Sequence, residues 1–463
     1  MSMLERIGGS GRDQPRRPAP AATLPEPERR ARGQLRPDLL EAKAIIHADL
    51  VELSAGGIDL TNRDAVRAMI VELTETHVRA TRQALTRADF DLLVESLLDD
   101  VLGLGPLEPL LDDPDITEIL INHPRQVYVE RAGRLQLSDV VFESERQLKL
   151  VIDRVVSSVD RRVDESSPMC DARLADGSRV NVVIPPLALK GACMSIRKFS
   201  TGMVTVQDLA RSRSCTSDMM QFLAAAVRAR LNVLVSGGTS SGKTTLLNAL
   251  SGFIPASERI VTIEDAAEVR LQQEHVITLE SRPPNVEGSG EVTIRALLRN
   301  SLRMRPDRIV VGECRGGEAL DMLQAMNTGH EGSMSTVHAN SAADALSRLE
   351  TMVLMAGAEL PIAAIRKQIA AAVDLIVQMQ RLRGGARRVV SITEITGLEG
   401  QEVTYQELFE YRQLGVSPEG AALGYHTATG VQPSHLEHLK AAGEDLPAGL
   451  FQRAAEPPRE ELY

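Results

Sequence analysis

An eight-residue string limits this chain more than any other feature of its sequence. Gly237-Gly-Thr-Ser-Ser-Gly-Lys-Thr244 fits the pattern G-x-x-x-x-G-K-[ST], in which a glycine-rich backbone curls its N–H groups around phosphate oxygens. An apolar run at residues 233–235 predicts a strand before the string, and residues 244–250 predict a helix after it. The N-terminus of such a helix adds partial positive charge at the same place. The sequence therefore predicts a phosphate-binding loop between a strand and a helix.

Each part of this loop has an expected role in binding ATP and Mg²⁺. Lys243 should reach the β- and γ-phosphates, and the hydroxyl of Thr244 should bind Mg²⁺. The alternative is a plain Gly/Ser turn, which would leave Lys243 without an anion to neutralise. The residues expected to contact the nucleotide are Gly237, Gly238, Thr239, Ser240, Ser241, Gly242, Lys243, Thr244 and Thr245.

Carboxylates follow two further predicted strands. Glu264 and Asp265 come directly after one of them, and Glu313 follows the other. In an open α/β sheet, ligands bind outside the carboxyl ends of the strands, where carboxylates suit Mg²⁺ coordination and the positioning of water. We expect Glu264 and Glu313 to be catalytic, and Thr244, Glu313 and Asp265 to hold Mg²⁺, partly through water. Helix capping or a solvated turn is the alternative role for such carboxylates.

A third segment, residues 328–340, is dense in small and polar residues where another strand should end. His338 in this segment is expected to sense the γ-phosphate through a hydrogen bond. A histidine satisfied by structural contacts explains the same residue equally well. No pair of cysteines has C-x-x-C spacing and no helix carries H-x-x-x-H, so the sequence predicts no zinc site.

Composition and periodicity divide the chain into four segments. Residues 1–37 are rich in Pro, Arg, Ala and Gly, which predicts a disordered arm. Three amphipathic patterns in succession predict a three-helix bundle at residues 38–102. Residues 103–199 predict an α+β domain, in which residues 140–142 are among the expected strands. Residues 200–463 alternate strands and helices, which predicts an α/β domain with a mostly parallel sheet covered on both faces.

The end of the chain has a different composition from the alternating segment before it. After about residue 415 it is rich in Gly, Pro and Ala. This composition predicts a helical tail of small helices and loops, packed on the α/β domain.

Composition also argues against two classes of partner. The net charge is -11, aromatic residues make up 3 % of the chain and tryptophan is absent, all of which make nucleic-acid binding unexpected. The longest apolar run, residues 369–379, is interrupted by Asp374 and is shorter than the roughly 20 residues that span a bilayer. Any connection to a membrane is therefore expected to pass through a partner protein.

The order and spacing of these residues resemble the secretion ATPase superfamily of type II and type IV secretion systems and type IV pilus motors. In that superfamily a Walker A loop is followed by an Asp box, a Walker B segment that ends in Gly-Glu, and a His box. The corresponding segments here are residues 237–245, 262–265, 309–313 and 329–340. The CpaF branch, which powers Flp/Tad pili, is similar at residues 171–181, 281–287 and 302–308.

The resemblance covers about residues 38–452 and implies a RecA-like domain, Mg-dependent ATP hydrolysis, and a homo-hexamer with nucleotide between its N-terminal and RecA-like domains. It also implies arginines that complete the site, and Arg173, Arg179 and Arg197 match such positions. A surface salt bridge is the alternative role for each of them. The implied partners are inner-membrane platform proteins of a Tad or type IV pilus machine, with this chain cytoplasmic and peripheral at the inner membrane.

Two other functions stay open at this point. One is a nucleic-acid translocase or a traffic ATPase of a DNA-transferring type IV secretion system, against which the charge and the scarce aromatics count. The other is a nucleotide-gated scaffold with little turnover, against which the combination of Glu264 and Glu313 counts. A GTPase is not expected, because the chain has no N-K-x-D motif.

Overall fold

The computed structural model describes residues 35–54, 62–131, 133–159, 161–199, 205–285, 288–357, 359–418 and 420–453. The chain forms two compact units, Met1–Gly105 and Pro106–Tyr463. The expected arm at residues 1–37 falls almost entirely outside the described residues. Among the helices that the structure does describe, none is both long enough and apolar enough to cross a membrane.

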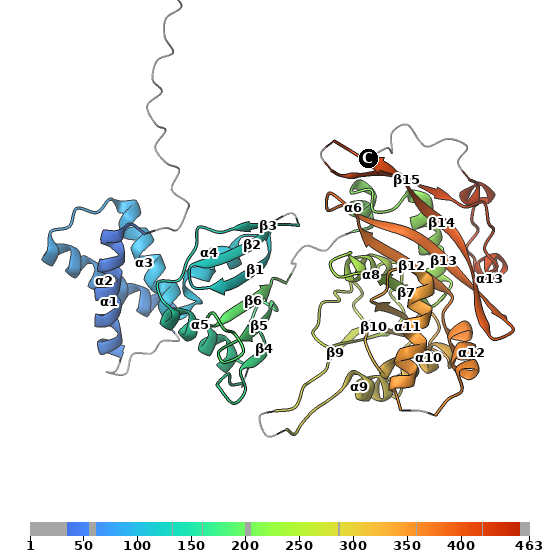
Figure 1. The fold of residues 1–463 in the computed structure, drawn as a ribbon, viewed down its shortest axis with the longest axis horizontal. Helices are drawn as coiled ribbons and strands as arrows, with labels where there is room; N and C mark the ends of the chain where they lie inside the picture. The colour runs from blue at the N-terminus through green and yellow to red at the C-terminus, as the bar shows by residue number, and fades with distance from the viewer. Residues whose placement is uncertain are drawn as a thin grey trace, which may run out of the picture. The chain divides into compact units, whose positions relative to one another are not determined.

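The first unit consists of three helices that pack on one another (Figure 1). Their bounds are α1 (Pro37–Ser54), α2 (Arg63–Thr81) and α3 (Arg87–Leu102). Each of the last two begins at a polar cap, because Asn62 accepts a hydrogen bond from Ala65 N and Thr86 accepts one from Asp89 N. Fully buried aliphatic side chains such as Leu39, Ile70 and Leu97 form the shared core. The periodicity of apolar residues therefore locates these helices correctly.

The second unit begins with a six-stranded antiparallel sheet in the order β3-β2-β1-β6-β5-β4. The boundary between the two units falls within η1 (Gly105–Leu107). The elements that follow it are α4 (Glu108–Asp112), β1 (Ile116–His123), β2 (Gln126–Arg131), β3 (Arg134–Leu137), α5 (Glu145–Ser157), β4 (Met169–Arg173), β5 (Arg179–Val183) and β6 (Cys193–Arg197). Buried and exposed residues alternate along β5 and β6, as one covered sheet face requires.

The expected strand at residues 140–142 is wrong. These residues form neither strand nor helix, and Phe142 instead anchors a loop, buried and bonded through its N–H to Pro124 O at 2.7 Å. The strand of this region is β3, whose four residues are all exposed. An exposed edge strand carries no pattern of buried residues. The apolar residues at 140–142 therefore predicted a strand where the chain forms a loop, and β3 was not predicted.

The rest of the unit is a nine-stranded sheet in the order β15-β14-β13-β12-β7-β11-β10-β8-β9. Six neighbouring strands are parallel: β7 (Val233–Gly237), β8 (Ile260–Glu264), β9 (Val276–Glu280), β10 (Arg308–Cys314), β11 (Met334–Val337) and β12 (Leu375–Arg381). Three more continue the sheet in antiparallel fashion: β13 (Arg387–Glu399), β14 (Glu402–Val416) and β15 (Ala422–Ala428). The expected α/β fold with a mostly parallel sheet is confirmed.

Helices cover both faces of the parallel strands (Figure 1). Val233 and Val235 of β7 point into a core with α7 (Ser217–Arg228) and α8 (Lys243–Ser251), whereas Leu234 points into the opposite core. That second core is shared with α9 (Ile294–Ser301), α10 (Glu318–Asn327), α11 (Ala342–Met355) and α12 (Ile362–Ala372). All residues of β7 are buried, which explains the uninterrupted apolar run at residues 233–235.

The expectation of only small helices and loops after residue 415 is wrong in part, because β14 extends to Val416 and β15 follows it. Only then come α13 (Leu436–Ala441) and η2 (Ala448–Phe451). Backbone pairing with β14 makes residues 422–428 a strand in spite of their Gly- and Ala-containing sequence. Three rings, Phe222, Phe409 and Phe451, meet at centroid distances of 5.5–6.0 Å and attach η2 to α7 and β14.

A buried ionic cluster joins the C-terminal segment to the sheet. His435 Nδ1 lies 2.5 Å from Glu394 Oε1, its Nε2 lies 3.4 Å from Asp374 Oδ1, and Glu394 is fully buried. Asp374 in turn accepts a hydrogen bond from Asn232 N at 2.7 Å, next to the start of β7. Hydrogen bonds from His435 to both carboxylates raise its pKa to about 9, so the cluster contains a charged imidazolium at neutral pH.

Replacing His435 by Gln should remove a pH-dependent part of the stability. The folded protein holds a proton on His435 up to pH about 9, whereas the unfolded chain releases it near 6.5. The contribution is therefore complete below pH 6.5, is lost as pH rises to 9, and amounts to roughly 2–3 kcal/mol. Urea unfolding at pH 6 and pH 9 checks this. His438→Gln should keep the wild-type pH dependence, and an H435Q protein that also kept it would contradict the assignment.

Candidate functional site

The phosphate loop links the end of β7 to the start of α8 through two positions that only glycine can occupy. A Cβ atom at Gly237 would lie 2.5 Å from Met379 O and 2.6 Å from Ser241 Oγ. Gly242, directly before the helix, has a φ of +97°, which side-chain-bearing residues rarely adopt. Nothing lies within 4 Å of the corresponding position at Gly238, so the outer side of the loop is open. The loop therefore has the shape that a phosphate cradle needs.

Lys243 is the first residue of α8 and is 8 % exposed. Its Nζ donates to Gly238 O at 3.0 Å and lies 3.4 Å from His338 Nε2. Burial lowers the pKa of Lys243, and the nearby charge of Glu313 opposes this shift. A partly desolvated ammonium held by a carbonyl oxygen has strong affinity for an anion at the mouth of the loop.

Two further side chains form a row with Lys243. They are His338, directly after β11, and Glu313, near the end of β10. Glu313 Oε1 lies 2.8 Å from His338 Nε2 but outside hydrogen-bonding geometry, so this buried oxygen has no hydrogen bond to any described residue. Burial lowers the pKa of His338, and the positive charge of Lys243 lowers it further. A lowered pKa favours the neutral imidazole, which suits a hydrogen bond rather than an ion pair.

Arg315, which the sequence analysis missed, bridges two of the expected metal ligands. Its Nη2 lies 2.7 Å from Glu313 Oε2 and its Nη1 lies 3.3 Å from Asp265 Oδ2. Asp265 also accepts a hydrogen bond from Ser281 Oγ at 3.0 Å. The sequence could have indicated Arg315, because it follows Glu313 by two residues and therefore lies at the same edge of the sheet.

Glu264 lies apart from this row. It is 3 % exposed, and its carboxylate accepts hydrogen bonds from Glu268 N at 2.9 Å and Val269 N at 3.0 Å. It packs against Gly312, where a Cβ atom would lie 2.6 Å from Glu264 Cγ. Within the described residues it has no polar contact with Lys243 or Glu313. Its contacts hold the loop at residues 265–269, and burial raises its pKa to about 7.

Two of the three expected arginines reach this loop from the six-stranded sheet. Arg173 pairs with Glu280 and donates to Ala267 O at 3.4 Å. Arg179 Nη1 lies 3.0 Å from Glu268 Oε1, and its Nη2 donates to Ala266 O at 3.3 Å. Arg197 instead pairs with Glu118 on the neighbouring strand β1 at 2.6 Å. The structure thus brings Arg173 and Arg179, but not Arg197, to the loop after β8.

The side chains at this edge form a donor set that fits Mg²⁺. Thr244 supplies a hydroxyl in the first turn of α8, and Glu313 and Asp265 supply carboxylates. Mg²⁺ prefers such oxygen ligands together with water and phosphate oxygens. The orphaned Glu313 Oε1 is the kind of buried acceptor that a metal-bound water satisfies.

Residues 100–419 match the model of the type II/IV secretion system protein family. This chain belongs to that family. A putative conjugal transfer protein of Mycobacterium tuberculosis is 39% identical over 335 residues, which are 71% of this chain and 94% of the relative. Type IV secretion system protein VirB11 of Brucella suis is 35% identical over 316 residues, 62% of this chain and 88% of the relative.

Solved structures of family members are also similar to this chain. The VirB11 ATPase from the Brucella suis type IV secretion system, solved with sulphate, is 34% identical, covers 62% of this chain and 91% of its own, and has a TM-score of 0.35. The pilus retraction motor PilT with bound ADP is 21% identical over 60% of this chain and 78% of its own, with a TM-score of 0.43. The match to the family model confirms the inferred membership of the secretion ATPase superfamily, whereas the CpaF branch stays a prediction.

The burial of Glu264 predicts a pH-dependent effect of this carboxyl group on the stability of the protein. The folded protein keeps a proton on Glu264 up to pH about 7, whereas the unfolded chain releases it near 4.5, so this group makes folding less favourable as pH rises between these values. Glu264→Gln should therefore be more stable than wild type at pH 8, by about 1–3 kcal/mol, and equally stable at pH 4.5. Thermal unfolding at both pH values measures this.

The exposed Glu274 offers a matched control, because Glu274→Gln changes the same charge outside the site. It should leave both the stability and its pH dependence unchanged. An E264Q protein that lost stability at pH 8 would show that the ionised carboxylate stabilises the fold, which contradicts a pKa raised by burial.

Proposed function

We propose that this chain hydrolyses ATP with Mg²⁺ and works as a ring-shaped motor of a secretion or pilus machine. The observation that carries the proposal is the row Lys243, His338, Glu313 and Arg315 at the carboxyl edge of β7, β10 and β11, next to the phosphate loop. Phosphoryl transfer depends on positioning and on stabilising charge, and this row supplies cations, a neutral donor and a carboxylate within contact of one another.

The phosphate loop is the proposed binding site of the triphosphate. Backbone N–H groups from Gly238 to Thr245 would surround the phosphates, with Lys243 exchanging its contact with Gly238 O for the β- and γ-phosphates. A phosphate oxygen is the better partner for this ammonium, because both groups are charged. His338, neutral and 3.4 Å from Lys243 Nζ, is placed to donate a hydrogen bond to the terminal phosphate.

Thr244, Glu313 and Asp265 are the residues that would hold Mg²⁺. When bound, Mg²⁺ supplies neutralisation of the charge on the β- and γ-phosphates. The carboxylate of Glu313 orients the attacking water through its Oε1, which lacks a hydrogen-bond partner among the described residues. Arg315 now neutralises both carboxylates, so it would have to move away from at least one of them.

Glu264 and two arginines act on the same site through the loop at residues 265–269. Glu264 fixes this loop from within the sheet, and we propose that it positions Asp265. Arg173 and Arg179 hold the same loop from the six-stranded sheet. Their proposed role is to stabilise negative charge on the transferred phosphate when this sheet moves toward the nucleotide. Arg197 is the weakest of the three candidates, because Glu118 already binds it.

The machine that this motor serves is a choice between two candidates. Similarity at three strings to the CpaF branch favours a hexamer that acts on inner-membrane platform proteins of a Flp/Tad pilus, from the cytoplasmic side. The names of the relatives, conjugal transfer protein and type IV secretion system protein VirB11, favour a DNA-transfer or type IV secretion ATPase at least as well. Both candidates require the same ATPase site.

Lys243→Ala should abolish ATP turnover without disturbing assembly. Removing the ammonium takes away a preorganised charge from the transferred phosphate, which costs at least about a hundredfold in kcat. Steady-state phosphate release, together with light scattering for the oligomer, measures both properties. Lys440→Ala, an exposed change on α13, is the control and should keep full activity. ATP turnover by K243A at the wild-type rate would rule out this site.

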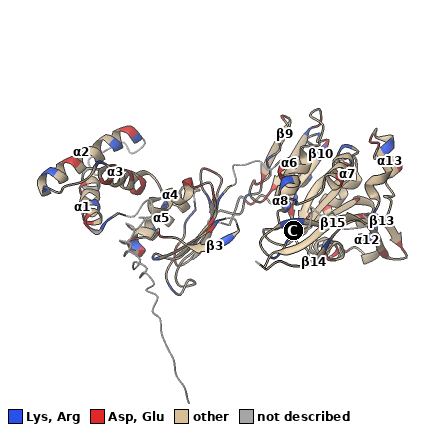
Figure 2. Ribbon diagram, turned by 90° about the horizontal axis from the view of Figure 1, so that it is seen from above, with Lys and Arg blue, Asp and Glu red and all other residues tan. Residues whose placement is uncertain are grey.

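DNA should neither bind tightly nor stimulate ATP turnover if the chain is a pilus motor. Its net charge is -11, and Figure 2 shows acidic and basic residues interspersed along helices such as α2. Fluorescence titration with a single-stranded and a double-stranded oligonucleotide, at 50 and 200 mM salt, checks this. A loss of affinity on the order of a thousandfold across that range, together with stimulated turnover, would favour the DNA-transfer candidate instead.

A further inference from the structure

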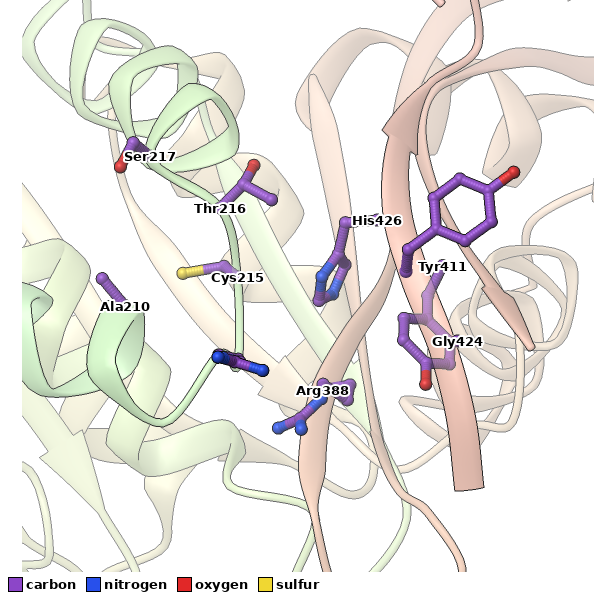
Figure 3. Close-up of a pocket in the computed structure, with 10 residues that line it drawn as sticks. Ala210, Cys215, Thr216, Ser217, Arg388, Tyr411, Gly424 and His426 are labelled. Carbon is purple, nitrogen blue, oxygen red and sulfur yellow. The ribbon is translucent and has the colours of Figure 1, made fainter. Parts of the chain in front are cut away.

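A cavity of about 260 Å³ lies between two segments that are far apart in the sequence. One wall is the connection from α6 (Val206–Arg211) to α7, and the other consists of β13, β14 and β15. Figure 3 shows Ala210 to Ser217 on one side, and Arg388, Tyr411 and His426 on the other. None of these residues belongs to the row around Lys243.

The charge of the cavity is opposite to that of the protein. Arg213 and Arg388 both line it, and no aspartate or glutamate does, although the chain as a whole has a net charge of -11. Burial lowers the pKa of Arg388, and the nearby positive charge of Arg213 lowers it further. Such a concentration of positive charge favours an anion.

Arg388 has no carboxylate partner in the described part of the chain. Its Nη1 donates to Ser212 O at 2.8 Å and to Arg387 O at 3.2 Å, which are neutral carbonyls. Its Nε and Nη2 have no hydrogen bond to a described residue. A half-buried guanidinium with unused donors is ready for a bidentate oxyanion.

The remaining walls are polar but uncharged. The hydroxyl of Tyr411 is buried and has no hydrogen-bond partner among the described residues. The ring of Tyr411 lies against Gly424, where a Cβ atom would approach Tyr411 Oη to 2.6 Å. Only a glycine at position 424 therefore leaves room for the ring in this position. His426 bonds through Nε2 to Val389 O at 3.0 Å, and burial lowers its pKa to about 4. Both rings are therefore neutral surfaces beside the two cations.

We propose that this cavity binds a small phosphorylated organic molecule, with its phosphate between Arg213 and Arg388. A phosphate carries up to two charges and three free oxygens, which match two guanidinium groups better than a carboxylate does. The size agrees, because an apolar cavity of roughly 150 Å³ holds a benzene molecule, and the space here admits a phosphate together with a ring of that size. The organic part would lie against His426 and Tyr411.

A ligand in this position would connect two parts of the domain. Ser214 already ties the α6–α7 connection to β13, since its Oγ donates to Arg387 O at 2.9 Å and its carbonyl accepts from Val389 N at 2.8 Å. Arg388 adds a third link through its bond to Ser212 O, and a phosphate between Arg213 and Arg388 would add a further one to the same junction. The ligand would thus hold α6 and its connection against the antiparallel strands.

Phenyl phosphate, titrated into the full-length chain by calorimetry, tests the proposal. The titration uses the Lys243→Ala protein, because the phosphate loop would otherwise bind the same probe. Adding Arg388→Gln should weaken binding at least about tenfold, as loss of a charge-assisted pair does. Adding Arg383→Gln, which removes the same charge from an exposed position outside the cavity, should leave the affinity unchanged.

A second variant guards against misfolding as the cause of lost binding. Ser217→Asp places a negative charge in the first turn of α7, where it should stabilise the helix while repelling the phosphate. Weaker binding without a lower unfolding temperature supports the site. Equal affinities of R388Q and R383Q, or binding of phenol or benzoate as tight as that of phenyl phosphate, would overturn it. Since the ATP site is disabled in every protein, the outcome does not depend on the proposed ATPase activity.

Discussion

The parallel pairing of β7 with β11, and of β11 with β10, is the constraint on which the site depends. Ser236 pairs with Val337, and Val311 pairs with Ser335, so the strands end at one edge of the sheet. The loop after β7, His338 after β11 and Glu313 near the end of β10 meet there for that reason. A change of register by one residue would turn these side chains to the other face. The chemistry of the edge is thus fixed by backbone hydrogen bonds within the core.

Local chemistry made much of this site predictable from the sequence. The phosphate loop could be identified because its glycines and Lys243 are adjacent in the chain and their roles follow from backbone geometry. The contact of Lys243 with His338 could not be predicted, because it requires β7 and β11 to be neighbours. The order of motifs along a chain does not give the order of strands in a sheet. Arg315 was missed because the search at strand ends was for carboxylates, whereas its importance arises from the pair it bridges.

The fold shows the same division between local and distant information. The helices of the first unit and the buried parallel strands have strong periodic patterns, and they lie where the patterns predict. β3 and β15 do not have such patterns: the residues of β3 are all exposed, and β15 exists because β14 offers it a backbone partner. The positive cavity is similarly invisible in the sequence, since Arg213 and Arg388 are brought together only by the antiparallel extension of the sheet.

The cluster of Phe222, Phe409 and Phe451 has a consequence for how the chain reaches its folded state. These three rings are among only seven phenylalanines in a chain without tryptophan, and they come from α7, β14 and η2. The core beneath α7 therefore stays open on one side until residue 451 has been synthesised. The α/β domain therefore cannot complete this packing until η2 has left the ribosome, long after α7 has emerged.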